Sequence, residues 1–173
     1  MQINQGSPTV SATARAQPEL SLIIVSYNCA GLLKECLASI ARNPASHEYE
    51  IIVVDNASRD GTPEKIQEWF PSVRVVRNCR NLGFAAANNR GAFQAKGEFL
   101  LLLNPDTIVE PGALDKLIGT MQSGNDIGVV GGRLLSSEGL AAISYGDFPD
   151  MRWVMTVCAP IPGLRLRRSE RLL

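Results

Sequence analysis

Two kinds of hydrophobic pattern alternate along the middle of the chain. Short, mostly unbroken apolar runs predict strands buried within a sheet. The predicted strands are Leu20–Ser26, Glu50–Val54, Val73–Val76, Phe99–Leu103 and Ile127–Gly131. Between them, apolar residues recur at helical spacing. This alternation predicts an α/β fold with a mostly parallel sheet, right-handed crossovers and helices on both faces.

The predicted helices have recognisable start and stop signals. The first contains Leu32 and ends at Asn43-Pro44, and the second begins at Thr62-Pro63. Two more are expected over about residues 84–94 and 112–121. No internal repeat interrupts this order, so we expect one domain with a sizeable core from the 173 residues.

The segment Phe99–Thr107 carries the strongest local signal. Five consecutive apolar residues predict a central strand buried on both faces, and Pro105 ends it. Asp106 then lies just beyond the carboxyl end of a strand, where open α/β sheets bind ligands. A carboxylate there can hold a divalent cation against a phosphate-bearing substrate. The alternative is that Asp106 caps the helix that begins near Pro111.

Polar residues follow three of the predicted strands, and parallel strands end at one edge of a sheet. The residues expected to meet there are Ser26, Tyr27, Asn28, Asp55, Asn56, Asn104 and Asp106. They suit a nucleotide, because Asp55 can accept hydrogen bonds from a base or ribose and Tyr27 offers a ring face. The alternative for Asp55 is a turn residue that bonds its own backbone, and we expect that role for Asp60-Gly61.

The two common phosphate-binding motifs are absent. Neither G-x-x-x-x-G-K-[ST] nor, after the first strand, G-x-G-x-x-G occurs. The charge of a diphosphate would therefore have to be met by a metal on Asp106 and by basic residues. Arg80 and Arg90 are the candidates for this positive charge.

Composition and charge narrow the function classes. Seventeen basic residues balance seventeen acidic ones, which gives no electrostatic reason to expect nucleic-acid binding. The four cysteines are scattered without a C-x-x-C pair, and the single histidine, His47, is expected at the surface. Residues 1–19 lack the apolar region of a signal peptide and are expected to form a flexible arm. No run is long enough to span a membrane, so we expect a cytoplasmic protein.

Four segments, in this order and spacing, resemble family 2 glycosyltransferases with a GT-A fold, and especially their rhamnosyltransferase-like branch. They are Ile23–Asn28, Ile51–Gly61, Asn81–Gly91 and Leu101–Thr107. The resemblance implies a three-layer α/β/α domain over residues 20–149 that binds a nucleotide-sugar. It also implies transfer of the sugar, from dTDP-rhamnose or a UDP-sugar, to a saccharide or lipid-linked acceptor during polysaccharide biosynthesis.

The resemblance also assigns roles by position. Asp106 matches the last acid of the family's DxD-like motif, which binds Mg²⁺ or Mn²⁺ against the diphosphate, and Asn104 stands in place of the first acid. Within Arg80–Arg90, Phe84 and Ala87 are expected to pack the helix, and the polar residues to border the donor. The expected nucleotide-binding residues are Ser26, Tyr27, Asn28, Asp55, Asn56, Arg80, Asn81, Asn89, Arg90 and Asn104.

The catalytic base that the resemblance implies is the missing part. No acid after Asp106 lies in the family's downstream acidic motif; these acids are Glu110, Asp115, Asp126, Glu138, Asp147, Asp150 and Glu170. We therefore expect the donor-binding half of a longer enzyme, or alternatively a non-catalytic nucleotide-sugar-binding fragment or partner subunit. A nucleotidyltransferase is less well matched, because Ser26–Gly31 contains no basic residue. The basic segment 150–173 is interpreted as a linker helix, or alternatively as a peripheral membrane contact.

Overall fold

The structure, a computed structural model, describes residues 17–136. The chain divides into two compact units, Met1–Gly131 and Gly132–Leu173. Of the second unit only residues 132–136 are described, and all of them are exposed. The helices and strands below all belong to the first unit. Most of the predicted N-terminal arm and the whole basic segment 150–173 lie outside the described residues.

Helices and strands alternate through the described part of the first unit. In chain order they are β1 (Leu20–Ser26), α1 (Ala30–Arg42), β2 (Tyr49–Asp55), α2 (Thr62–Trp69), β3 (Arg74–Arg77), α3 (Phe84–Gln94), β4 (Phe99–Leu103) and α4 (Ala113–Gln122). All the helices predicted from the apolar spacing are present, with boundaries close to those expected.

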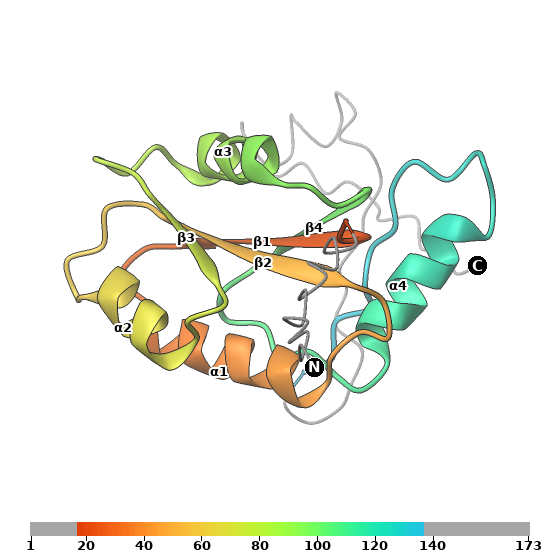
Figure 1. The fold of residues 1–173 in the computed structure, drawn as a ribbon, viewed down its shortest axis with the longest axis horizontal. Coiled ribbons are helices and arrows are strands. Elements are labelled where there is room, and N and C mark those ends of the chain that lie inside the picture. Colours follow the sequence, from red (N-terminus) through yellow and green to blue (C-terminus); the bar gives the residue numbers. More distant parts are fainter. Residues whose placement is uncertain (1–16, 137–173) are drawn as a thin grey trace, which may run out of the picture. The chain divides into compact units, whose positions relative to one another are not determined.

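The strands form one parallel sheet in the order β3-β2-β1-β4. Figure 1 shows α3 over one face of the sheet and α1 and α2 over the other. Side chains of successive strand residues point to opposite faces, so β1 supplies apolar residues to both layers. The predicted three-layer α/β/α arrangement is confirmed.

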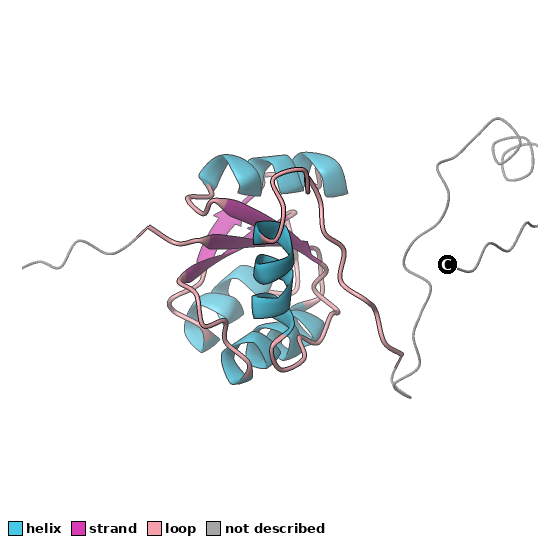
Figure 2. Ribbon diagram, turned by 90° about the vertical axis from the view of Figure 1, so that its right-hand side faces the viewer, coloured by secondary structure: helices cyan, strands magenta, loops and turns pink. Residues whose placement is uncertain are grey.

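The larger core lies between the sheet and the helices α1, α2 and α4. Leu22 and Ile24 of β1 are fully buried there, with Leu33 of α1 and Ile66 of α2. Ile118 of α4 belongs to the same cluster, and Figure 2 shows α4 close beside the sheet. Burying one such side chain stabilises the fold by about 1.5–3 kcal/mol, so this layer holds the sheet firmly.

The helix α3 contributes only small residues to the layer between itself and the sheet. Its buried cluster contains Ile23, Ile52 and Val54 from the sheet but only Ala87 from the helix. A Cβ atom added to Gly91 of α3 would lie 2.5 Å from Cγ2 of Ile23. The helix therefore rests directly on the sheet at Gly91.

The substitution Gly91→Ala is expected to destabilise the fold. Overpacking of this kind costs about 1–3 kcal/mol, which exceeds the gain of up to about 1 kcal/mol from better helix propensity. Urea unfolding measures the difference. Gly119→Ala in α4 is the matched control. A Cβ there meets nothing within 4 Å, so this substitution should stabilise the fold slightly. If both variants gained stability equally, the close contact at Gly91 would be wrong.

Two strand predictions require correction. β4 lies at the edge of the described sheet, and its side chains alternate, with Leu100 and Leu102 50% and 54% exposed. The expectation of a central strand buried on both faces is wrong for the described part, because α3 packs on β1 and β2. Residues 127–131 are not a strand. Val129 is 90% exposed, and flanking glycines lower the tendency to extend without a paired neighbour.

Candidate functional site

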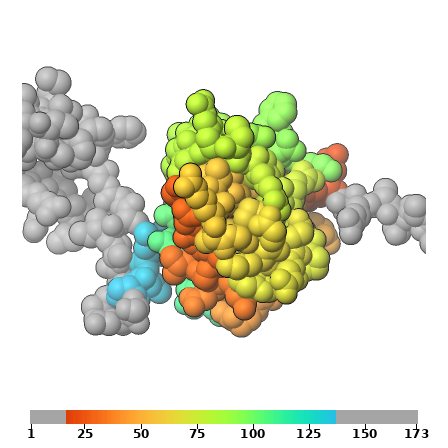
Figure 3. Space-filling model, turned by 90° about the vertical axis from the view of Figure 1, so that its left-hand side faces the viewer, coloured from red at the N-terminus to blue at the C-terminus, as the bar shows by residue number. Residues whose placement is uncertain are grey.

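All the strands of the sheet end at the same side of the molecule. Figure 3 faces this side, with the segment after β2 in orange to yellow and the segment after β3 in yellow-green. The polar residues that follow the strands therefore come to one rim, as the parallel arrangement predicted.

A hollow of about 460 Å³ opens at this rim. It is lined by Val25, Tyr27, Cys29, Leu32, Asn56, Asn81, Gly83, Phe84, Asn104, Pro105 and Asp106. The residues come from the ends of all four strands and from the helices that follow β1 and β3. Of the residues predicted to form the site, Tyr27, Asn56, Asn81, Asn104 and Asp106 are brought together here.

Asp106 is an exposed side chain in the turn that follows β4. A contact with α1 anchors this turn: the thiol of the buried Cys36 donates to the Asn104 carbonyl at 3.8 Å. Burial, aided by the nearby Asp106 carboxylate, raises the pKa of Cys36 to about 11, so the thiol keeps its proton. The capping alternative for Asp106 is wrong, since α4 begins after Gly112 without a side-chain cap.

The rim offers hard oxygen ligands but few of them. The described residues contain no group of three His, Cys, Asp or Glu side chains that could hold a metal. Asp106 supplies a carboxylate, and Asn104 an amide, at the same hollow. Mg²⁺ is usually held by one or two carboxylates together with substrate phosphates. The residues therefore fit Mg²⁺ or Mn²⁺ that is shared with a diphosphate, rather than a cation bound by the protein alone.

Asp55 is only 2% exposed and does not line the hollow. Its Oδ2 accepts the backbone N–H of Ser58 at 3.0 Å, and its Oδ1 accepts the Ser26 hydroxyl at 3.4 Å. The bond from Ser58 forms a turn, which is the alternative role considered for Asp55 in the sequence. Ser26 is also fully buried. Direct contact of Ser26 or Asp55 with a nucleotide stays a prediction.

Removing the Asp55 carboxylate is expected to weaken the fold. In Asp55→Ala the Ser26 hydroxyl and the Ser58 N–H lose their acceptor, which should lower the free energy of unfolding by about 1–3 kcal/mol. Glu68→Ala, at an exposed position of α2, should change it by less than about 0.5 kcal/mol. Urea unfolding followed by circular dichroism measures both. A fully stable Asp55→Ala that binds UDP more weakly would instead support direct recognition of the nucleotide.

Asn28 and Asp60 tie two neighbouring loops together. Asn28 has a left-handed backbone, and its Oδ1 accepts the N–H of Arg59 at 2.7 Å. Asp60 accepts the N–H of Ala30, at the start of α1, and the N–H of Thr62. The turn role expected for Asp60 is confirmed, whereas Asn28 serves loop packing in the described contacts.

The pKa of Asp60 reflects this position. Burial raises it, but the hydrogen bonds from Thr62 and Ala30 together outweigh burial and leave it below the ordinary 3.8. The ionised Asp60 carboxylate therefore stabilises the fold fully when the pH is above its ordinary pKa. This stabilisation is lost as the pH falls through the lowered pKa of the folded protein.

Asn56 anchors the loop that follows β3. Its Nδ2 donates to the Gly83 carbonyl at 3.3 Å, and its Oδ1 accepts the Leu82 N–H at 3.3 Å and the Asn78 amide at 2.8 Å. No local pattern in the sequence pointed to Asn78, because these partners lie more than twenty residues apart. Asn56 thus shapes the hollow as well as lining it.

The two predicted basic contacts, and the predicted contact Asn89, are not brought to the hollow. Arg80, Asn89 and Arg90 are exposed, and none lines it. Within residues 17–136 no lysine or arginine lines the hollow. The positive charge expected from Arg80 or Arg90 is therefore not in place in the described structure.

Six of the lining residues were not predicted as contacts, namely Val25, Cys29, Leu32, Gly83, Phe84 and Pro105. Cys29 and Leu32 come from the start of α1, and Phe84 opens α3. Burial raises the pKa of the Cys29 thiol, so this residue contributes shape rather than charge. The expectation that Phe84 packs its helix is wrong, because its side chain is 57% exposed. The sequence did offer one signal that Phe84 lines the site: this residue begins a predicted helix in the segment that follows a predicted strand.

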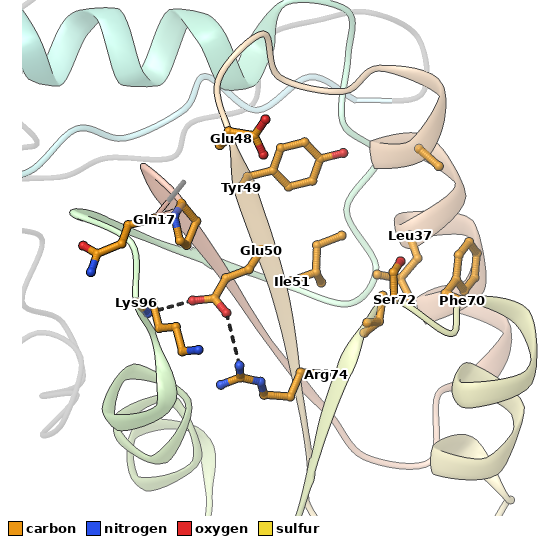
Figure 4. A pocket seen from close by; sticks show the side chains of 13 residues that line it. Gln17, Leu37, Glu48, Tyr49, Glu50, Ile51, Phe70, Ser72, Arg74 and Lys96 are labelled. Atoms are coloured by element: carbon orange, nitrogen blue, oxygen red, sulfur yellow. Dashed lines mark hydrogen bonds and ion pairs between the residues drawn. The ribbon is translucent and has the colours of Figure 1, made fainter. Parts of the chain in front are cut away.

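A larger hollow, of about 1080 Å³, lies where β2 begins, at the opposite end of the strands. Figure 4 shows that one of its acids is paired with its neighbours: Glu50 accepts the Lys96 backbone N–H at 2.7 Å and faces the Arg74 guanidinium at 3.7 Å. None of the predicted site residues lines it. The candidate site is therefore the strand-end rim.

No helix within residues 17–136 has the length and apolar character needed to cross a bilayer.

Comparisons with known proteins agree with the motif analysis. The family model described as "Glycosyl transferase family 2" matches residues 21–166. A dolichol-phosphate mannosyltransferase of Pyrococcus furiosus is 34% identical over 168 residues, which are 88% of this chain and 47% of that protein. Glycosyltransferase AglE of Haloferax volcanii is 30% identical over 142 residues, 78% of this chain and 46% of that protein. The chain thus spans about half the length of these relatives.

Solved structures show the same fold. The mannosyltransferase PcManGT from Pyrobaculum calidifontis, solved in complex with GDP-Man and Mn²⁺, matches with a TM-score of 0.57 and 27% identity. The match covers 63% of this chain and 34% of that one. TarS of S. aureus, residues 1–349, matches with a TM-score of 0.54 and 26% identity over 60% of this chain and 32% of that one. The predicted GT-A fold is confirmed.

Proposed function

This chain belongs to glycosyl transferase family 2, and we propose that its strand-end hollow binds a nucleoside-diphosphate sugar as the donor for glycosyl transfer. The donor proposed is dTDP-rhamnose or a UDP-sugar, and the acceptor is a hydroxyl of a saccharide or a lipid-linked molecule. The observation that carries the proposal is that Tyr27, Asn56, Asn81, Asn104 and Asp106 line one hollow although they follow different strands. The complex of PcManGT with GDP-Man and Mn²⁺ supports this ligand class.

The chemistry of the lining residues suggests how the donor lies. Tyr27 offers an aromatic face to the base, and the exposed amide of Asn81 can bond its edge or the ribose. Asn104 and Asp106, after β4, would hold Mg²⁺ or Mn²⁺ together with the diphosphate. When bound, this cation stabilises the negative charge that develops on the departing diphosphate. The absence of basic side chains from the described hollow makes the cation the main source of positive charge there.

The positions of the acidic side chains within the described residues favour a second function. Asp106 is the only carboxylate that lines the hollow within residues 17–136, and Asp115 is engaged by Ser46 at 2.7 Å and 3.0 Å. Glu138, Asp147, Asp150 and Glu170 lie outside the described residues. General-base catalysis needs a group within hydrogen-bond reach of the acceptor proton. A non-catalytic nucleotide-sugar-binding unit is therefore the alternative function.

Calorimetry tests the proposal directly. The full chain is titrated with UDP, dTDP and GDP in Mn²⁺ and again in EDTA. We expect UDP or dTDP to bind in Mn²⁺ and to bind more weakly in EDTA. No nucleotide binding in either buffer would contradict the proposed function, and equal affinity in both would contradict the role of the cation. We further propose a cytoplasmic location. For residues 150–173 we propose a linker helix, with peripheral membrane contact through their arginines as the alternative.

A further inference from the structure

Phe84 is a large aromatic side chain that the described fold leaves uncovered. It is 57% exposed, and it lines the same hollow as Tyr27, which is 50% exposed. Scattered exposed apolar residues are ordinary. Two exposed aromatic rings at one mixed polar and apolar hollow are the pattern of a ligand site, where a few polar groups orient a ligand among apolar walls.

Several hydrogen bonds hold the backbone around Phe84. Gly83 has a φ of 79°, and its N–H donates to the Asn81 side chain at 2.8 Å. Its carbonyl accepts the Asn56 amide, and the Phe84 carbonyl accepts the Asn88 side chain at 3.0 Å. Phe84 is therefore exposed although hydrogen bonds hold the backbone on which it stands. The fold presents this ring at the hollow on a well-bonded support.

The two aromatic residues reach the hollow from different layers, Tyr27 from the end of a sheet strand and Phe84 from a helix. Tyr27 directly follows β1, and Phe84 is the first residue of α3. Figure 1 shows α3 over one face of the sheet that contains β1. A planar group that enters the hollow between the strand end and this helix can therefore meet both rings. The exposed amide of Asn81 lines the same hollow and can bond the edge of such a group.

We propose that Phe84 is a binding residue for the nucleobase of the donor and that it contacts the face of the base opposite Tyr27. The proposal rests on the proposed function and deepens it. A nucleobase is the part of the donor that is both planar and able to stack. The diphosphate belongs at the other end of the hollow, beside Asn104 and Asp106, where oxygen ligands for a cation lie.

Substitutions at Phe84 test this through the affinity for UDP in Mn²⁺. Stacking of one base on an aromatic side chain is worth about 1–3 kcal/mol, so Phe84→Ala should weaken binding by about 5- to 150-fold. Phe84→Tyr should keep near wild-type affinity, and Phe84→Leu should lose most of it despite its apolar side chain. Phe93→Ala is the matched control, because Phe93 lies on the same helix, is 89% exposed and does not line the hollow.

The ligand series separates the base from the phosphates. Phe84→Ala should weaken uridine by a factor similar to that for UDP, and it should leave inorganic pyrophosphate with Mn²⁺ unchanged. Phe84→Leu and Phe84→Tyr also carry the comparison if the alanine variant folds poorly. Unchanged UDP affinity in Phe84→Ala, or equal losses in Phe84→Leu and Phe93→Ala, would overturn the role of Phe84 while metal-dependent nucleotide binding survives. No nucleotide binding by the wild type would overturn the proposed function itself.

Discussion

Asp106→Ala is expected to abolish the response of nucleotide binding to Mn²⁺. The described hollow contains one carboxylate and no basic side chain, so this substitution removes the anchor of the cation that offsets the diphosphate charge. Even groups that only orient a metal ligand change metal affinity by about 10- to 100-fold, and loss of the carboxylate ligand should cost at least as much. Calorimetry with UDP or dTDP, in Mn²⁺ and in EDTA, measures the effect.

Glu110→Ala provides the matched control for Asp106→Ala. Glu110 is an exposed acid on the same connection between β4 and α4, and it does not line the hollow. Its removal should leave the Mn²⁺ response intact. Because Asp106 is also exposed, neither variant should change the urea midpoint appreciably. An Asp106→Ala protein that still gains affinity from Mn²⁺ would show that the cation is held elsewhere.

The second large effect concerns turnover. Residues 1–173 alone are expected to bind the donor but to transfer sugar about 10²- to 10⁴-fold more slowly than a complete site, which is the usual cost of a missing general base. Slow hydrolysis of the donor by water should remain and should need Mn²⁺, because stabilisation of the leaving diphosphate does not depend on the base. Release of labelled sugar, with and without a lipid-linked or saccharide acceptor, measures both reactions.

Rapid transfer would contradict this expectation. Turnover at an ordinary enzymatic rate, on the order of 1 s⁻¹ or above, would mean that the chain contains its own base. The candidates for that base would be Asp126, Glu138, Asp147 and Asp150. Replacing each by its amide, and comparing transfer with donor hydrolysis, would identify it.

Local signals in the sequence predicted the position of Asp106 well. The apolar run Phe99–Leu103 and the proline after it placed this carboxylate at a strand end, and the structure has it in the turn after β4. Such signals act over a few residues, since they concern backbone freedom and the spacing of apolar side chains. The helices and the parallel order of the strands followed from the same kind of evidence.

Features that depend on distant partners were not predictable in this way. The apolar run of β4 could not show that Leu100 and Leu102 lie beyond the cover of α3, because covering is decided by another element. Asp55 looked available for a ligand, yet the Ser26 hydroxyl and the Ser58 N–H occupy its oxygens. A sequence pattern states which groups need partners but not which of several partners the fold will bring.

The close approach of α3 to the sheet has a consequence for the motion of the site. Because α3 meets the sheet mainly through Ala87 and Gly91, it buries less apolar surface than α1, and helices with few buried contacts open locally at lower free energy. The first residue of this helix is Phe84, at the hollow. A ligand held there would lose part of its contact whenever α3 opens, so it stabilises the closed helix by the same free energy that the closed helix contributes to binding. Affinity at this rim would thus be coupled to the local opening equilibrium of a single helix.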